Sequence, residues 1–337
     1  MGVLARLTLR ERIWPLLAVF FGAPVCAEYL QAYLPGTGDG LGMLAGLLIF
    51  GPLYGGAALL IREIAVRTGR GWRGIVLLAT AFGVAMPGLV DLSLFAEDNP
   101  GVAYWDQLRL PTLLDPLGIA VYPTIVWVLG HVLMSVGAPL ALLNGLAPRH
   151  RQRPLLGGVG LAVVATLWLA VTVFVRSDAA ENEPSFAQTA SACVCVAALG
   201  VLAFTPVGRP VAATTAGQRI SPWKVLVAGF VGMLIIDLAP PTWPGVGLVV
   251  CVVLTAAVVL GATIRNRRWT AYEIALLAAG ALIGRTLTGF LAPLPEGVSA
   301  VAKYSSSTVL LAVVTLIAAA VVRSGHRVGP TTEVLRP

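Results

Sequence analysis

Ten long apolar runs constrain this 337-residue chain more than any other feature. A helix that spans a membrane needs about 20 mostly apolar residues, each adding about 1.5 Å. Hydrophobic residues make up 57% of the chain and charged residues 12%, about half the charged share of a soluble domain. The sequence therefore excludes a soluble enzyme and predicts an all-α, polytopic transmembrane helix bundle, with residues 1–337 as a single integral membrane domain. The runs lie at 13–34, 41–61, 74–95, 118–146, 155–175, 186–206, 225–239, 245–264, 271–291 and 305–322.

Basic residues orient these predicted spans. Lys and Arg favour the cytoplasmic loops of a membrane protein. With a cytoplasmic N-terminus, 19 of the 23 basic residues fall on the cytoplasmic side, whereas the other side holds Arg109, Arg176, Lys303 and nine acids. We therefore expect a multi-pass protein of the bacterial cytoplasmic (inner) membrane with both termini in the cytoplasm. The net charge of +7 is then a topology signal, and we expect the lipid bilayer rather than a nucleic acid as the partner.

Two segments leave alternatives open. The basic stretch up to Arg12, the apolar run 13–24 and the small residue Ala27 are also typical of a cleavable signal peptide. Removal of the first span would leave the rest of the chain facing the same way. The seventh run, 225–239, is short and ends at prolines, so it is either a full span or a half-span.

The longest segment between predicted spans, residues 96–117, mixes acidic residues with aromatic and leucine side chains. Such a mixture is typical of a segment that lies in a membrane interface. We expect an outer interfacial loop or lid, either anchored by Trp105 among the interfacial aromatic residues or folded back as a re-entrant element. Trp105 is a candidate contact for a substrate.

Five ionisable residues fall inside predicted spans: Glu28, Asp91, His131, Asp237 and Arg285. Charges in hydrocarbon are costly and mark either a function or a specific partner. Counting about 1.5 Å per residue puts the two acids Glu28 and Asp91 in the outer half of the bilayer. By the same count the other three lie near that level, so the five could share one outward-facing polar cavity.

The residue types in this set suggest roles. Glu28, Asp91 and His131 are candidate catalytic groups, because carboxylates and imidazole can act as general acids and bases. Arg285 and Asp237 are candidate substrate contacts. The alternative for Arg285 is a structural ion pair with Asp237 or Asp91 across helices.

Metal and covalent chemistry have little support in the sequence. Zinc would have to use His131 together with the intramembrane carboxylates, and no nucleophile-elbow pattern surrounds a nearby serine. We predict neither a metal nor a cofactor. The cysteines form no CxxC pair and are expected to be small buried hydrophobic residues; they are Cys26, Cys193, Cys195 and Cys251.

Prolines predict breaks in four of the first five spans. A proline removes the hydrogen bond to the carbonyl four residues before it, and in a membrane the freed oxygen must face protein or water. Both Glu28 and Asp91 lie four residues after such a proline. Breaks that line a functional cavity and kinks that assist packing both fit this pattern. The prolines are Pro24, Pro52, Pro87 and Pro139.

Two stretches resemble a group of uncharacterised, chiefly actinobacterial membrane proteins: IREIAVRTGRGWRGIVLLATAFGVAMPGLVDLSLF at 61–95 and VWVLGHVLMSVGAPLALLNGL at 126–146. In that group a pair of glutamates stands at the position of Met86 and Pro87, and a histidine at that of His131. These residues in turn resemble those of the CAAX-processing and bacteriocin-processing (CPBP-type) intramembrane glutamate proteases. Met86 and Pro87 cannot activate water. The resemblance therefore implies a shared scaffold that is repurposed or catalytically degenerate.

Three functions from different classes fit these observations. The first is a protease-like scaffold that binds or converts an amphipathic substrate. The second is a small-molecule permease or exporter of the drug and metabolite transporter type, which also has ten spans with both termini inside. The third is an accessory or immunity protein that acts through contacts alone. The sequence leaves open the choice between enzyme, transporter and accessory protein, and with it the substrate, the coupling ion and the oligomeric state.

Reporter fusions test the predicted topology. We expect fusions after Arg153 and Arg268 to report a cytoplasmic location and fusions near Asp106 and Glu181 an external one, because basic loops stay inside. Alkaline phosphatase and a fluorescent protein, which need opposite compartments, give the two readouts. A reversed pair at either side would contradict the ten-span topology.

Overall fold

The computed structural model of the protein describes residues 8–99, 101–179, 183–211 and 217–327. In this part the chain is a bundle of helices with one small antiparallel pair of strands, β1 (Leu113–Leu114) and β2 (Ile119–Ala120). Eight helices of the described chain are long and apolar enough to cross a membrane. These findings confirm the predicted all-α helical class.

Several helices continue through π-helical segments, in which hydrogen bonds join residues five apart, and so form longer rods. The first four rods are α1 (Leu9–Pro24) with η1 (Val25–Tyr29), α2 (Gly40–Phe50) with η2 (Gly51–Gly56) and α3 (Ala57–Arg67), α4 (Trp72–Ala85) with η3 (Met86–Val90), and α6 (Val121–Gly130) with η6 (His131–Gly137) and α7 (Ala138–Leu146). The other rods are α8 (Gly158–Asp178), α9 (Phe186–Phe204), α10 (Pro222–Leu238), α11 (Trp243–Asn266), α12 (Ala271–Gly289) and α13 (Ala300–Arg327).

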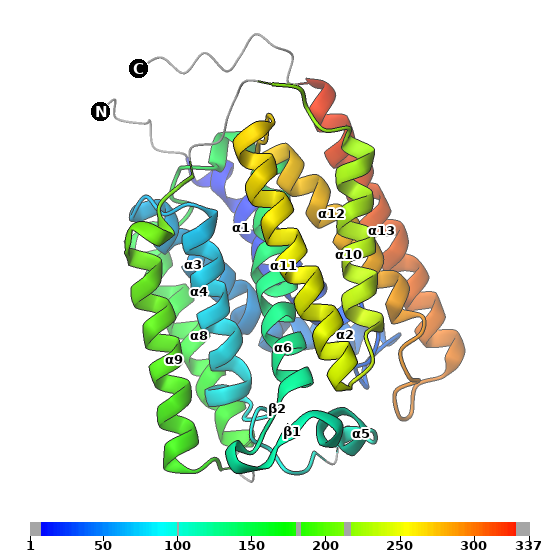
Figure 1. The fold of residues 1–337 in the computed structure, drawn as a ribbon. Coiled ribbons are helices and arrows are strands. Elements are labelled where there is room, and N and C mark those ends of the chain that lie inside the picture. The colour runs from blue at the N-terminus through cyan, green and yellow to red at the C-terminus, as the bar shows by residue number, and fades with distance from the viewer. Residues whose placement is uncertain (1–7, 100, 180–182, 212–216, 328–337) are drawn as a thin grey trace.

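Each of the ten predicted runs coincides with one of these rods. Two rods are not among the eight candidate spans. One is α1 with η1, which carries Arg12 and Glu28 near its ends, and the other is α10, which has 17 residues. α10, which coincides with the run 225–239, packs along α12 (Figure 1).

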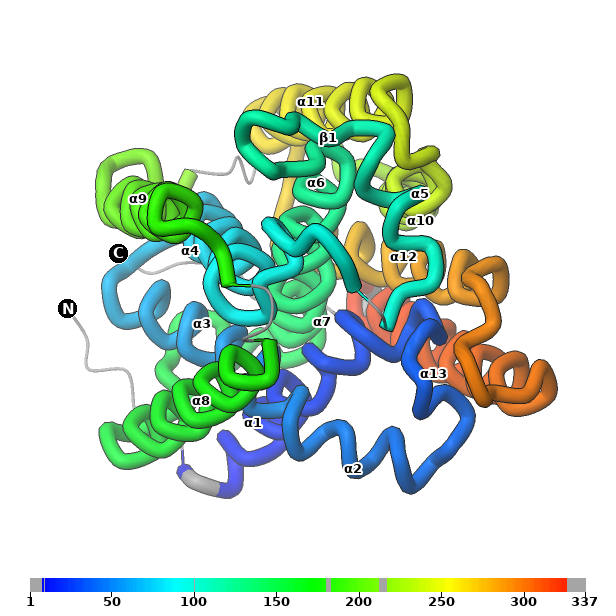
Figure 2. Tube along the Cα trace, turned by 90° about the horizontal axis from the view of Figure 1, so that it is seen from below, coloured from blue at the N-terminus to red at the C-terminus, as the bar shows by residue number. Residues whose placement is uncertain are grey.

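The rods lie side by side, with their connections at two ends (Figure 1). At one end, here called the basic end, α3 joins α4, α7 joins α8, α9 joins α10 and α11 joins α12. α1 begins and α13 ends at the same end. The other connections lie at the opposite end, here called the acidic end. Seen along the rods, α7 lies near the middle, with α1–α4, α8 and α9 to one side and α10–α13 to the other (Figure 2).

Side-chain caps fix where two rods begin at the basic end. The Thr8 hydroxyl accepts a hydrogen bond from the backbone of Glu11, and the Glu11 carboxylate accepts one from the backbone of Thr8. Thr270 and Glu273 repeat this capping box at the start of α12. Each box satisfies N–H groups that the first turn of a helix leaves free.

A buried carboxylate ties α3 to the connection between α7 and α8. Glu63 is 0% exposed, and its oxygens lie 2.9 Å from Nη1 of Arg62 and 3.2 Å from Nη2 of Arg67. The backbone N–H of Leu155 also donates to Glu63, at 2.8 Å. Both guanidinium groups donate in turn to backbone carbonyls of the same connection. The network therefore satisfies a buried charge from several sides, as such a charge requires.

Helices α8, α9 and α11 present apolar side chains on the outside of the bundle. Val159 of α8 is 81% exposed, Phe186 of α9 is 89% exposed and Val258 of α11 is 71% exposed. An apolar surface of this extent on three rods suits contact with lipid rather than with water.

Three of the four cysteines lie on exposed parts of these helices, so the expectation that all four are buried is wrong. Cys26 is buried, whereas Cys193, Cys195 and Cys251 are exposed. The reason is physical: in a membrane protein the lipid-facing surface is as apolar as the core, so an apolar run does not distinguish a buried residue from a lipid-facing one.

Glycines allow α10 and α12 to approach each other closely. A Cβ atom at Gly280 would lie 1.9 Å from the carbonyl oxygen of Leu226, and one at Gly229 would lie 2.0 Å from that of Leu277. Gly284 follows one turn after Gly280 on the same side of α12 and also faces the α10 backbone. Small residues four apart are typical of closely packed membrane helices.

This packing predicts an unfavourable effect of one methyl group. Alanine in place of glycine ordinarily stabilises a helix by about 0.5–1 kcal/mol. We expect Gly280→Ala instead to lower the free energy of unfolding by about 1–3 kcal/mol, because the methyl group would overlap a backbone oxygen. Thermal unfolding in detergent measures the difference. The matched control is Gly232→Ala on α10, where a Cβ atom meets nothing within 4 Å; equal effects of both changes would contradict this packing.

The connection between η3 and α6 folds over the acidic end of α6. It contains α5 (Trp105–Arg109), the short 3-10 turns η4 (Leu110–Thr112) and η5 (Asp115–Leu117), and the strand pair. Trp105 is buried and stacks on Trp127 of α6, with ring centroids 5.8 Å apart and an interplanar angle of 18°. Leu110 and Leu117 are exposed. The role of 96–117 as an interfacial loop or lid stays a prediction.

Candidate functional site

Four π-helical segments of the described chain lie beside the four prolines at which the sequence predicts breaks. Pro52 and Pro87 fall inside η2 and η3, Pro24 directly precedes η1, and Pro139 follows η6 by two residues. A π turn holds one extra residue, which shifts the hydrogen bonds around a missing donor and leaves room for the proline ring. The predicted breaks are therefore confirmed as π-helical segments.

Protein covers the backbone oxygen that the first proline frees. Pro24 removes the hydrogen bond to the carbonyl of Phe20, and this oxygen lies against Gly55 of η2, where a Cβ atom would be 2.0 Å from it. The absence of a side chain at Gly55 thus lets η2 pack directly on the break in α1. This arrangement meets the rule that a free carbonyl in a membrane must face protein or water.

The π-helical segments bring polar side chains to one place. Glu28 lies in η1, Tyr54 in η2 and His131 at the start of η6, and Asp91 is the residue that caps η3. Contacts of η6 with η1, η2 and α4 hold these segments together. We call these four residues and Tyr33 the central cluster.

The hydroxyl groups of two tyrosines lie next to the Glu28 carboxylate. The carboxylate is 8% exposed, and the Tyr33 hydroxyl donates to Oε2. The Tyr54 hydroxyl lies beside the same carboxylate. Tyr33 is 40% exposed and follows η1 at the acidic end, so the cluster adjoins the surface there.

His131 is held by aromatic rings and by a serine. Its ring stacks on Tyr54, with centroids 5.8 Å apart, and meets the edge of Phe82 at 5.3 Å. Nδ1 lies 3.1 Å from Oγ of Ser135, one turn further along the rod. No hydrogen bond joins Nε2 to the described part of the chain. One nitrogen of the ring is therefore held by Ser135, and the other has no partner among the described residues.

Asp91 lies next to a strained backbone. Its Oδ1 accepts from the Ser93 hydroxyl at 2.5 Å and from the Ser93 backbone N–H at 3.0 Å. Within the described residues, positive φ angles at non-glycine positions occur at Leu92, beside Asp91, and at Ala32, beside Tyr33. Such conformations cost about 1–3 kcal/mol each and are concentrated at functional sites. Both side chains are buried at 1% exposure, which holds them in place.

The central cluster carries two carboxylates without a salt bridge. Asp91 and Glu28 are close enough to interact electrostatically. Arg285 interacts electrostatically with Tyr33 and His131. In the described chain, none of the ion pairs involves either of these two carboxylates.

Arg285 forms its salt bridge elsewhere. It pairs with Asp237 of α10, which confirms the predicted pairing with Asp237 or Asp91. The Thr288 hydroxyl donates to the other oxygen of Asp237, at 2.8 Å. The side chains of Arg285 and Asp237 are 15% and 2% exposed. These two candidate substrate contacts therefore pair with each other and fasten α10 to α12, while Nε of Arg285 is buried without a hydrogen-bond partner in the described chain.

Open space adjoins His131 on the central rod. A Cβ atom at Gly130 would meet nothing within 4 Å. Trp127, Gly130 and His131 all keep partial exposure, although their rod lies inside the bundle (Figure 2). Protein atoms thus leave part of this rod uncovered next to the central cluster.

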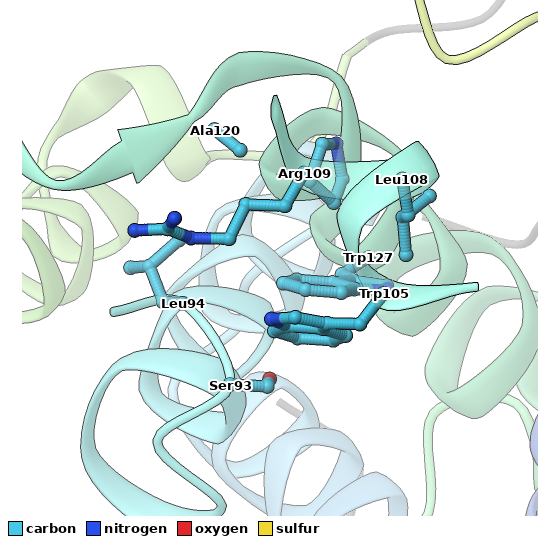
Figure 3. A pocket seen from close by; sticks show the side chains of 8 residues that line it. Ser93, Leu94, Trp105, Leu108, Arg109, Ala120 and Trp127 are labelled. Atoms are coloured by element: carbon cyan, nitrogen blue, oxygen red, sulfur yellow. The ribbon is translucent and has the colours of Figure 1, made fainter. Parts of the chain in front are cut away.

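A separate hollow, which we call the Trp105 pocket, lies where α5 covers α6 (Figure 3). Its wall includes Ser93, whose hydroxyl is bound to Asp91. The structure thus places Trp105 in a pocket that neighbours the central cluster rather than inside the cluster. The lining residues are Ser93, Leu94, Trp105, Leu108, Arg109, Ala120, Pro123 and Trp127.

Among the described residues, the central cluster does not show the contacts of a catalytic triad. Ser135 contacts His131 but is 1% exposed, so a substrate cannot reach its hydroxyl. A catalytic triad also needs a carboxylate on the imidazole, and none contacts His131 in the described chain. Met86 and Pro87, at the positions of the glutamates in the resembling proteins, are buried in η3. Among the residues described, no three His, Cys, Asp or Glu side chains are grouped to hold a metal ion.

Comparison with known proteins identifies a family. The sequence profile of an uncharacterized membrane protein family matches residues 17–334. The chain belongs to this family. The match covers the central cluster and the Trp105 pocket, and with the eight apolar helices it supports a multi-pass membrane protein. No curated protein and no solved structure matches the chain.

Sequence reasoning found the ionisable members of the cluster and missed its tyrosines. Tyr33 and Tyr54 are ordinary residues in a membrane protein, so charge and hydropathy do not single them out. The position of Tyr54, two residues after Pro52, is the signal that could have found it. The sequence places Arg109 in a loop between spans and does not show that it is buried, because its burial depends on how α5 folds over α6.

The Arg285–Asp237 pair gives a test by double mutation. We expect Arg285→Gln to lower the free energy of unfolding by about 3–5 kcal/mol, because it leaves a buried carboxylate without its partner. The double variant Arg285→Gln/Asp237→Asn should recover much of the folded yield and of the thermal stability in detergent. Arg285→Gln/Asp91→Asn is the control. Recovery in the control but not with Asp237→Asn would contradict the pairing.

Proposed function

We propose that the protein binds an amphipathic substrate from the membrane at the central cluster and does not hydrolyse it. The observation that supports this function is the convergence of four helix breaks on two carboxylates that have no salt bridge. Charged groups inside a membrane are costly and mark function by default. Glu28 and Asp91 accept hydrogen bonds from neutral groups but have no positively charged partner, and a polar group that binds to them would supply one.

The residues of the cluster suggest the nature of that group. The carboxylates of Glu28 and Asp91 accept hydrogen bonds, so the polar end of the substrate is a donor such as an ammonium, amide or hydroxyl group. Nε2 of His131 offers a further contact. The open space at Gly130 would hold the adjoining part of the substrate. In this proposal Arg285 and Asp237 hold the wall of the site rather than the substrate.

The charge pattern supports an orientation for this function. We propose that all ten rods span the membrane, with the basic end and both termini in the cytoplasm and the acidic end outside. The site then opens toward the outer leaflet. The 23 basic residues are arginine except for Lys224 and Lys303, a bias that favours a GC-rich bacterium such as an actinobacterium. The location would be its cytoplasmic membrane.

The resemblance to CPBP-type proteases supports a shared scaffold. It rests on residues 61–95 and 126–146, which contribute Asp91 and His131 to the central cluster. The residues that would activate water are replaced by Met86 and Pro87. A binding protein built on a catalytically degenerate protease-like scaffold accounts for both facts.

A permease or exporter is the second candidate, and the breaks in the rods favour it. Transporters often bind their substrates where membrane helices are interrupted near the middle of the bilayer. The two candidate functions differ in the sides of the membrane from which the site can be reached. A Gly130→Cys variant that lacks the native cysteines should react with a membrane-impermeant maleimide from outside if the protein binds. Reaction from both sides would favour the permease.

Retention of the substrate tests the proposed function. We expect an amphipathic molecule to copurify with the protein and to be detected by mass spectrometry after denaturation. Asp91→Asn and His131→Ala should reduce the retained amount about tenfold or more, since a hydrogen bond to a charged group contributes about 1.5–3 kcal/mol. Folded yield should persist, and purified protein should cleave no peptide.

Asp106→Asn removes an exposed acid at the same end and serves as the matched control, with no expected loss. Full retention in both cluster variants would mean that the cluster is structural and would favour the accessory role. Peptide cleavage that survives purification and disappears in His131→Ala would overturn the non-hydrolytic function.

A further inference from the structure

We infer that the Trp105 pocket binds an anionic oxygen group, a phosphate or a carboxylate, through the guanidinium of Arg109 and the indole N–H of Trp105. The inference concerns a second site and does not depend on the central cluster. It rests on two hydrogen-bond donors that line one pocket without protein partners in the described chain, a guanidinium and a buried indole N–H.

Arg109 is the first of these donors. It is 9% exposed and lines the pocket. In the described chain it takes part in no hydrogen bond and no salt bridge, whereas the other outer arginine, Arg176, pairs with Glu183 at 2.8 Å. The side chain as a whole is mostly buried, but its guanidinium nitrogens are not among the fully buried atoms, so an anion can reach them and pair with the charge.

Trp105 supplies the second donor. Its Nε1 atom is buried and has no hydrogen-bond partner. A buried indole N–H usually finds an acceptor. Arginine and tryptophan side chains donate hydrogen bonds and accept none, so a ligand that satisfies both has to be an acceptor. The guanidinium also prefers acceptors with two oxygens in a plane, as carboxylate and phosphate provide.

The rest of the pocket strengthens this preference. Leu94, Leu108, Ala120 and Pro123 form an apolar wall, and the Arg109 side chain reaches toward Leu94 above the stacked indole rings (Figure 3). Attraction between charges is stronger in such low-dielectric surroundings than in water. The Ser93 hydroxyl gives its hydrogen to Asp91, so it adds no competing donor.

The shared chemistry has two possible sources, a lipid headgroup and a free anion. Leu110, Leu114 and Leu117 of the same segment are exposed beside the pocket, where they would meet the lipid interface. A phosphodiester headgroup and an inorganic phosphate ion are therefore both to be tested.

The experiment uses full-length protein in nanodiscs of phosphatidylcholine with rising fractions of phosphatidylglycerol, and, in a second arm, inorganic phosphate added to pure phosphatidylcholine nanodiscs. A ligand that binds the folded state raises the melting temperature. We expect phosphatidylglycerol to stabilise the wild type, and Arg109→Gln to need about tenfold more of it for half of the effect. Trp105→Phe keeps a ring on Trp127, removes the N–H, and should weaken the effect several-fold.

Control variants outside the pocket and further variants within it distinguish the possible outcomes. Arg176→Gln removes an outer charge outside the pocket and should keep the full effect. Stabilisation by phosphate but not by lipid, lost in Arg109→Gln, supports the pocket with a free anion as ligand. If Arg109→Gln does not fold, Arg109→Lys and Trp105→Phe decide. Equal responses of these pocket variants and the wild type, an equal loss in Arg176→Gln, or no response to either anion would overturn the inference.

Discussion

A backbone carbonyl that loses its hydrogen bond inside a membrane must be covered by protein or water, and the first four rods are organised by that requirement. Their prolines are accommodated by π-helical segments, and the segments pack on one another. Gly55 lies directly on the carbonyl of Phe20. Polar side chains on these segments meet as a result. The central cluster therefore forms when the π-helical segments pack together.

The second half of the bundle packs by a different principle. α10 and α12 cross through Gly229 and Gly280, each against the backbone of the other helix, and the Arg285–Asp237 pair locks the same two helices. α12 also packs on α7, which continues the rod that carries His131. The central rod therefore connects two halves of the bundle. In the first half the π-helical segments pack on one another, and in the second half α10 and α12 pack through glycines.

Much of the fold was predictable, because each apolar run or proline carries its own signal along the chain. The ten runs coincide with the ten rods, and the four prolines with the four π-helical segments of the described chain. What the sequence does not show is which side of a rod faces lipid, as the exposed Cys193 and Cys251 illustrate. Nor does it show contacts between distant segments, which alone place Tyr54 on His131 and bury Arg109 under α5.

The buried network at the basic end changes how the charge of the protein is to be understood. Arg62 is 3% exposed, and Arg62 and Arg67 both direct their guanidinium groups at Glu63 and at backbone carbonyls. These arginines count toward the excess of basic residues at the basic end, yet Arg62 is withdrawn from the surface in the folded bundle. Part of the positive charge at the basic end thus forms internal cross-links instead of facing outward. Anionic lipid headgroups that meet the basic end therefore cannot contact Arg62.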